Sequence, residues 1–100
     1  MILTTTNSVE DYKIITYKGI VSGSTLSTPK MTFTFSMKKY YADFNDTVLE
    51  VKANAFKELQ ENAEKLNANA VVGILVDVEL TTSNYILVTV NGTAVNIMNK

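Results

Sequence analysis

The 100-residue chain contains no cysteine and no histidine. Without cysteine there is no disulfide framework, no thiolate nucleophile and no thiolate metal ligand. Without histidine the chain lacks the side chain that most often serves as a general base near neutral pH and as a transition-metal ligand. These two absences exclude the catalytic and soft-metal chemistry that depends on thiols and imidazoles.

A strong charge of one sign and a long apolar run are also missing. The formal net charge is -1, so no basic field exists to hold nucleic acid. No run approaches the roughly 20 apolar residues that a membrane span needs. The segment Met1–Thr6 has neither the basic start nor the apolar core of a signal peptide. We therefore expect a cytoplasmic protein whose partners include neither nucleic acid nor a membrane.

The remaining composition is that of an ordinary globular domain. Hydrophobic residues make up 46% of the chain and charged residues 19%, which argues against disorder. A chain of this length suits one domain with a modest core. Residues 1–100 are therefore expected to form a single domain.

The longest helical pattern covers about residues 45–66. Apolar residues share one arc of a helical wheel: Val48, Val51, Ala55, Phe56, Leu59, Ala63 and Leu66. Lys52 falls within this arc. Either its stem packs while its ammonium group reaches solvent, or it is a cation in a pocket or interface that binds an anion or an acidic side chain such as Asp77 or Glu79. Asn67, just past the helix, is a suitable C-cap residue.

Alternating patterns predict strands elsewhere. They cover residues 13–22, 31–37, 70–80, 85–91 and 93–98, and residues 2–6 are also β-prone. Gly19 predicts a bulge, and Asn91-Gly92 predicts a turn or bulge. The strands on either side of residues 81–84 are expected to pair as an antiparallel hairpin. The chain is thus predicted to be α+β, with one long helix on one face of a mainly antiparallel sheet.

The sheet is apolar on both faces. The residues expected to face the helix are Val72, Ile74, Val76, Val78 and Leu80. The apolar residues left on the other face are Ile15, Tyr17, Val21, Val71, Leu75 and Leu87. Each exposed aliphatic side chain forgoes about 1.5–3 kcal/mol of burial. A second layer should therefore cover that face, most simply another copy of the chain.

Three blocks of the chain resemble the YbjQ family, small bacterial proteins of unassigned function. The first comprises Met1–Thr6, Tyr12–Ile14 and Tyr17–Gly23, the second is Ala68–Gly73, and the third is Gly92–Val95. The motif positions, to which the resemblance assigns a structural role, are Asn67, Ala68, Asn69, Ala70, Val71, Val72, Gly73, Gly92, Thr93 and Ala94. The family usually has an arginine where this chain has Lys52, and a glycine where it has Asn67.

The resemblance implies a β-α-β-β subunit of the dodecin-like type, with extra short strands that aid assembly. It implies a ring-shaped homopentamer, and hence a self-assembling, non-enzymatic binding or structural domain. The family also carries the label "putative heavy-metal-binding". Its middle segment is rich in glycine, whereas this chain has methionine, phenylalanine and tyrosine over residues 31–41.

A metal-binding module is the alternative. Asp77 and Glu79 share a strand face and are the candidate metal ligands, because carboxylates bind hard divalent cations. The competing interpretation is a pair of solvated surface acids. A soft heavy metal would need methionine thioethers, which at strand spacing more often pack. No cofactor is expected apart from such a divalent metal.

Nucleic-acid binding and catalysis have little support. Lys38–Tyr41 places two lysines beside two tyrosines, a pattern that can bind single strands, but no second basic patch accompanies it. A loop or interface segment is therefore favoured there. The hydroxyl groups have no histidine or cysteine to activate them, and no glycine-rich phosphate loop is present. We expect no catalytic residues and no enzymatic activity.

Overall fold

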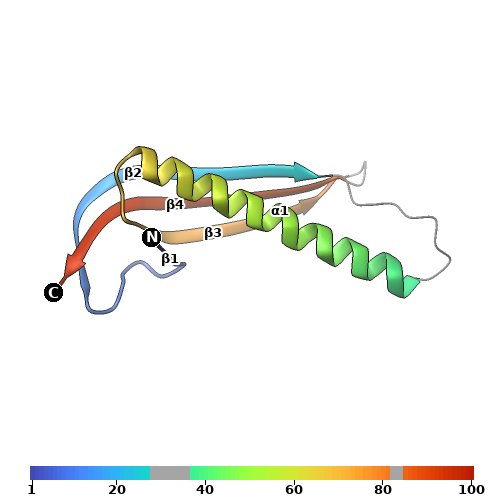
Figure 1. The fold of residues 1–100 in the computed structure, drawn as a ribbon, viewed down its shortest axis with the longest axis horizontal. Coiled ribbons are helices and arrows are strands. Elements are labelled where there is room, and N and C mark those ends of the chain that lie inside the picture. Colours follow the sequence, from blue (N-terminus) through green and yellow to red (C-terminus); the bar gives the residue numbers. More distant parts are fainter. Residues whose placement is uncertain (28–36, 82–84) are drawn as a thin grey trace.

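The computed structural model describes residues 1–27, 37–81 and 85–100, and for residues 37–44 it describes the backbone alone. The elements are β1 (Ile2–Leu3), β2 (Tyr12–Ser27), α1 (Met37–Lys65), β3 (Ala70–Leu80) and β4 (Ile86–Asn99). The strands form one sheet in the order β1-β3-β4-β2, and α1 crosses one face of it obliquely (Figure 1). The fold is therefore α+β, one helix on a mixed four-stranded sheet.

The sheet is mainly antiparallel, as predicted. Central strand β4 is antiparallel to both β2 and β3, so the expected hairpin of β3 and β4 is confirmed. The exception is β1, which pairs in parallel with β3, Ile2 opposite Ala70. Of the turn or bulge predicted at Asn91-Gly92, the turn is absent because β4 runs straight through, whereas an irregularity in the pairing with β3 does lie opposite Gly92. Glycine is needed at position 92 for a different reason, because a Cβ there would lie 2.5 Å from Cγ1 of Val71.

A bulge in β3 exchanges the two faces of that strand. The register between β3 and β4 shifts between Val72 and Leu75, and Gly73 within the bulge has φ +63°. Val71 and Ile74 consequently both lie in the core under α1. Val72 faces the opposite way, so the prediction that it meets the helix was wrong. The extra residue of a bulge breaks the two-residue alternation on which that prediction depended.

Helix α1 begins at Met37, well before the expected start near residue 45. The strand predicted over residues 31–37 lies outside the described residues except for Met37, which is helical. Lys38–Tyr41, expected to be a loop or interface segment, belongs to α1. The face of α1 toward the sheet carries side chains at four-residue spacing, all fully or almost fully buried: Val51, Ala55, Leu59 and Ala63.

The C-terminal end of α1 forms the cap that the sequence predicts. Asn67 has φ +60°, and its N–H donates to the carbonyl of Glu64 at 2.9 Å. The N–H of Ala68 donates to the carbonyl of Ala63 at 3.1 Å. These two bonds define a Schellman motif, and the contact between buried Ala68 and Ala63 belongs to the same motif. The cap turns the chain directly into β3.

Helix α1 covers only part of the sheet. It packs mainly on β2 and β4 and touches β3 little. Asn62 on one flank of the helix donates from Nδ2 to the carbonyl of Ser22 in β2 at 2.8 Å. The other flank overhangs β3, where side chains on the helix side of the sheet stay partly exposed: Val76, Val78 and Leu80.

Candidate functional site

The sheet face away from α1, here called the open face, is apolar and largely bare. The N-terminal segment covers one end of it, where Val9 packs together with Tyr12 and Ile14 of β2 against a buried cluster: Ala70, Val72, Val95 and Ile97. Beyond that end, Tyr17 is 70% exposed, Ile20 82% and Leu75 74%. Tyr17 is placed on this face by its partner Val95, and Ile20 by the row it forms with Thr93 and Val72.

The list of residues expected on this face was partly wrong. Val21 and Val71 face α1 and are buried in the main core. Tyr17 and Leu75 lie on the open face, Ile15 is exposed at an irregularity in β2, and Leu87 is half-buried. The bulges in β2 and β3 account for the errors, since each changes which alternate residues share a face.

Asp77 and Glu79, the candidate metal ligands, also lie on the open face. They pair with Thr89 and Leu87, while Val78 between them pairs with Val88, which is buried under α1. Both carboxylates are exposed. Among the described residues no three acidic side chains gather closely enough to hold a metal ion. Asp77 and Glu79 thus offer at most four of the six to eight oxygen ligands that a calcium ion takes.

Lys52, the candidate cation, lies in the other layer. It is half-buried on the flank of α1 that overhangs β3, one helical turn from Val48 and from Phe56. Because Asp77 and Glu79 project from the open face, the sheet stands between them and Lys52. The fold therefore does not bring the predicted cation and the predicted carboxylates together within one chain.

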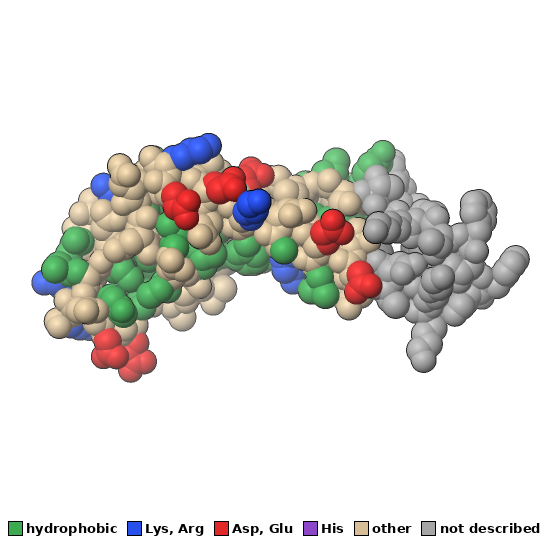
Figure 2. Space-filling view, viewed as in Figure 1, with side chains coloured by type: hydrophobic (Ala, Val, Ile, Leu, Met, Phe, Trp, Pro, Cys, Tyr) green, Lys and Arg blue, Asp and Glu red, His purple; other side chains and the backbone are tan. Residues whose placement is uncertain are grey.

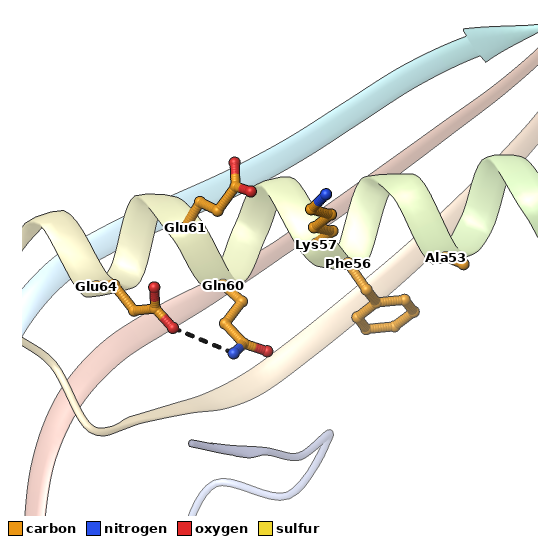
Figure 3. Close-up of a pocket in the computed structure, with 6 residues that line it drawn as sticks. All are labelled: Ala53, Phe56, Lys57, Gln60, Glu61 and Glu64. Carbon is orange, nitrogen blue, oxygen red and sulfur yellow. Dashed lines mark hydrogen bonds between the residues drawn. The ribbon is translucent and has the colours of Figure 1, made fainter.

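A pocket that the sequence reasoning missed lies along the same flank of α1 (Figure 3). It has a volume of about 510 Å³ and is lined by Ala53, Phe56, Lys57, Gln60, Glu61 and Glu64. Phe56 and Gln60 project from one side of the helix, whereas Lys57 and Glu61 point the other way. Nε2 of Gln60 donates to Oε1 of Glu64 at 3.1 Å. A helical wheel places most of these residues on the solvent side of the helix. Phe56, at the edge of the apolar arc, was the only feature of the sequence that pointed to this pocket.

A second pocket, of about 480 Å³, lies on the N-terminal segment beside Thr4, Thr6 and Ser8. The two threonine hydroxyls are 2.8 Å apart, and Oγ1 of Thr6 also donates to the carbonyl of Ser8 at 2.6 Å. These hydroxyl groups bond to one another and to the backbone, so they order the segment without a ligand.

The motif residues shape the backbone. Asn69 anchors the start of β3 to β4, with its side chain bonded to the backbone of Ile97 and its N–H to the carbonyl of Val95. Gly92 admits the close approach of Val71. Together with the Asn67 cap, these contacts give the motif a structural part in the fold.

The fold and its surfaces define an α+β domain with a bare apolar sheet face and a helix-flank pocket. A family model described as "Putative heavy-metal-binding", that of YbjQ, matches residues 1–98. A UPF0145 protein of Acetivibrio thermocellus is 32% identical over 97% of this chain and 99% of its own length. One from Clostridium kluyveri is 35% identical, over 95% of this chain and 97% of its own length. The chain belongs to the YbjQ family.

A solved structure supports the fold. A protein of unknown function from Pediococcus pentosaceus superposes with a TM-score of 0.72 over 98% of both chains, at 19% sequence identity. At this identity the likeness establishes the architecture alone. In the part of the chain that the structure describes, no helix combines the length and apolar character needed to cross a membrane.

Proposed function

We propose that this chain is a non-enzymatic cytoplasmic domain that assembles with itself, as a ring-shaped homopentamer with a structural or binding role. One observation carries the proposal: Tyr17, Ile20 and Leu75, each 70–82% exposed, share the open face beyond the end that the N-terminal segment covers. A large apolar surface of this kind marks an interaction site. The resemblance to the YbjQ family supplies the ring, the subunit count and the dodecin-like assignment, with β1 as a short strand that aids assembly.

The free energies of burial and of association require more than one apolar patch in the interface. Burying a large apolar side chain stabilises by about 1.5–3 kcal/mol, whereas association costs about 4–15 kcal/mol in lost freedom and ordering. Tyr17, Ile20 and Leu75 together cover that cost only at its lower end. The partly exposed side chains on the helix side of β3 are a second source of apolar area: Val76, Val78 and Leu80.

Lys52 has a role in this proposal as an interface cation. Its ammonium group lies in the helix layer, and Asp77 and Glu79 lie on the opposite side of the sheet. An ion pair among them can therefore form between copies, where the helix layer of one subunit approaches the open face of another. An anion bound at the same interface is the other way to satisfy the charge.

Sedimentation velocity of the purified chain at micromolar concentration tests the assembly, and native mass spectrometry counts the subunits. We expect a discrete oligomer of five copies. A monomer at these concentrations overturns the proposal, and a discrete oligomer of another size overturns the pentamer while leaving self-assembly in place. The circular dichroism spectrum, measured on the same sample, shows that the material is folded.

A divalent-metal module is the second candidate, favoured by the position of Asp77 and Glu79 on one exposed face and by the description of the family. An assembly would bring several such carboxylate pairs together. Isothermal titration with calcium, magnesium and zinc, on the wild type and on an Asp77→Asn/Glu79→Gln variant, tests it. Heat that the variant lacks supports a metal site. No heat, with an oligomer size unchanged by a chelator, rules against it.

A further inference from the structure

The most exposed apolar segment of β2 is a bulge at residues 17–20, here called the Tyr17 bulge. The pairing with β4 shifts between Tyr17 and Gly19, which leaves Lys18 as the extra residue. Residues three apart in a regular strand face opposite ways, but the extra residue places both Tyr17 and Ile20 on the open face. Gly19 has φ +135°, and no atom lies within 4 Å of the position that its Cβ would occupy. The bulge thus presents two apolar side chains and one ammonium group from an edge strand.

The helix-flank pocket has the complementary chemistry. Exposed Ala53 leaves room beside Phe56, which is half-buried and packs on the main core. Glu61 and Glu64 outnumber the single ammonium group of Lys57 among the charged residues that line it. Figure 2 shows apolar side chains at the surface beside the charged residues of α1. The pocket is therefore part apolar and net acidic, as a site for the Tyr17 bulge would need to be.

The two features lie on opposite sides of the sheet, so one chain cannot join them. The bulge is on edge strand β2, and the pocket overhangs β3, with β4 between these strands. Contact between two bulges would set Lys18 against Lys18, and contact between two pockets would set carboxylates against carboxylates. Only a contact between the bulge of one copy and the pocket of another matches both the charge and the apolar character of the two surfaces. In a pair of copies joined in this way, one bulge and one pocket remain free to bind further copies.

We propose that the Tyr17 bulge of one copy docks in the helix-flank pocket of the next, head to tail. Lys18 then faces Glu64, which lies on the same side of α1 as Phe56, and Tyr17 and Ile20 cover Ala53 and Phe56. Contacts between different patches of identical chains propagate, and they close into a ring when the rotation between subunits allows. This inference rests on the proposed self-assembly and names the two surfaces that meet in it.

Two variants separate the surfaces. Tyr17→Thr/Ile20→Thr removes the apolar part of the bulge at exposed strand positions. Ala53→Arg/Glu64→Lys fills the pocket and reverses part of its charge at exposed helix positions. Sedimentation velocity of each alone should show a loss of the oligomer to monomer. An equimolar mixture should form a heterodimer and nothing larger, because one intact bulge and one intact pocket remain.

Matched controls use similar changes elsewhere. Met98→Thr removes an exposed apolar side chain of β4, and Glu58→Lys reverses an exposed charge of α1 outside the pocket. Both should leave the oligomer intact, and circular dichroism should show all four variants folded. A mixture that stays monomeric, or variants that assemble like the wild type, overturns the docking while self-assembly stands. A monomeric wild type overturns the proposed function as well.

Discussion

The side-chain amide of Asn69 pairs with the backbone of Ile97 in both directions. Its Nδ2 donates to the carbonyl of Ile97 at 2.9 Å, and the N–H of Ile97 donates to its Oδ1 at 2.8 Å. The pair holds the first residues of β3 against the end of β4, next to the cluster that the N-terminal segment covers. A single side chain thus extends the strand pairing where the backbone emerges from the helix cap.

Replacing Asn69 by alanine should destabilise the fold. The change leaves the N–H and carbonyl of Ile97 without these partners, which costs about 1–3 kcal/mol for a buried group. Urea unfolding at fixed protein concentration measures the free energy of unfolding. Asn99→Ala, an exposed amide at the end of β4, should change it by less than about 0.5 kcal/mol. Equal effects of the two variants would show that the pair with Ile97 contributes nothing.

Asn67 should respond to substitution by backbone conformation alone. At φ +60° an alanine is strained, by about 1–2 kcal/mol, whereas glycine is not. Asn67→Ala should therefore lower the melting temperature, and Asn67→Gly should keep or raise it. The same order measured by thermal circular dichroism supports the cap, and a loss with glycine as large as with alanine contradicts it.

Gly23 should not tolerate a side chain, because β2 and α1 meet there at the backbone. A Cβ would overlap the carbonyl oxygen of Ala55 and lie 2.8 Å from the amide nitrogen of Leu59. Overpacking of this kind costs about 1–3 kcal/mol, so Gly23→Ala should lower the midpoint of urea unfolding. Ser24→Ala, at the next and exposed position, is the control and should leave the midpoint nearly unchanged.

Leu59 and Leu49 offer a matched comparison on one helix. Leu59 is fully buried between α1 and the sheet, whereas Leu49 is 54% exposed. Leu59→Ala should cost about 2–5 kcal/mol through lost burial and the cavity left behind, and Leu49→Ala much less. A similar loss from both in chemical denaturation would contradict the placement of α1 on the sheet.

Lys52 can be tested with the charge removed and the apolar stem retained. Lys52→Met should weaken the assembly and reduce its sensitivity to salt, because an ion pair between copies would be lost. Lys52→Arg keeps the charge and should assemble like the wild type. Sedimentation velocity of each variant at about 50 and about 500 mM NaCl measures the extent of assembly and its sensitivity to salt. If the methionine variant assembles as the wild type does at all salt concentrations, Lys52 is only a packed stem.

The local features of this chain could be read from the sequence because neighbouring residues cause them. Alternating residues predict β3 with the observed bounds, and Asn67 predicts the cap, since each depends on the conformation of a few consecutive residues. The sequence did not predict that α1 begins as early as Met37. Alternating residues over 31–37 favoured a strand that included Met37, whereas Met37 is the first residue of the helix. The flank pocket was missed because helix periodicity does not tell how far a helix overlaps each strand.

The sequence by itself determined the chemistry that is absent, the α+β class, the exit from the helix and the family. Only the tertiary structure decided which side chains share a surface. The bulges in β2 and β3 reverse the alternation, so that Val72 turns away from α1 while Tyr17 and Ile20 come to the same face. The sheet separates Lys52 from Asp77 and Glu79. These relationships depend on the register between strands that are distant in the chain, and a bulge of one residue reverses every face that follows it.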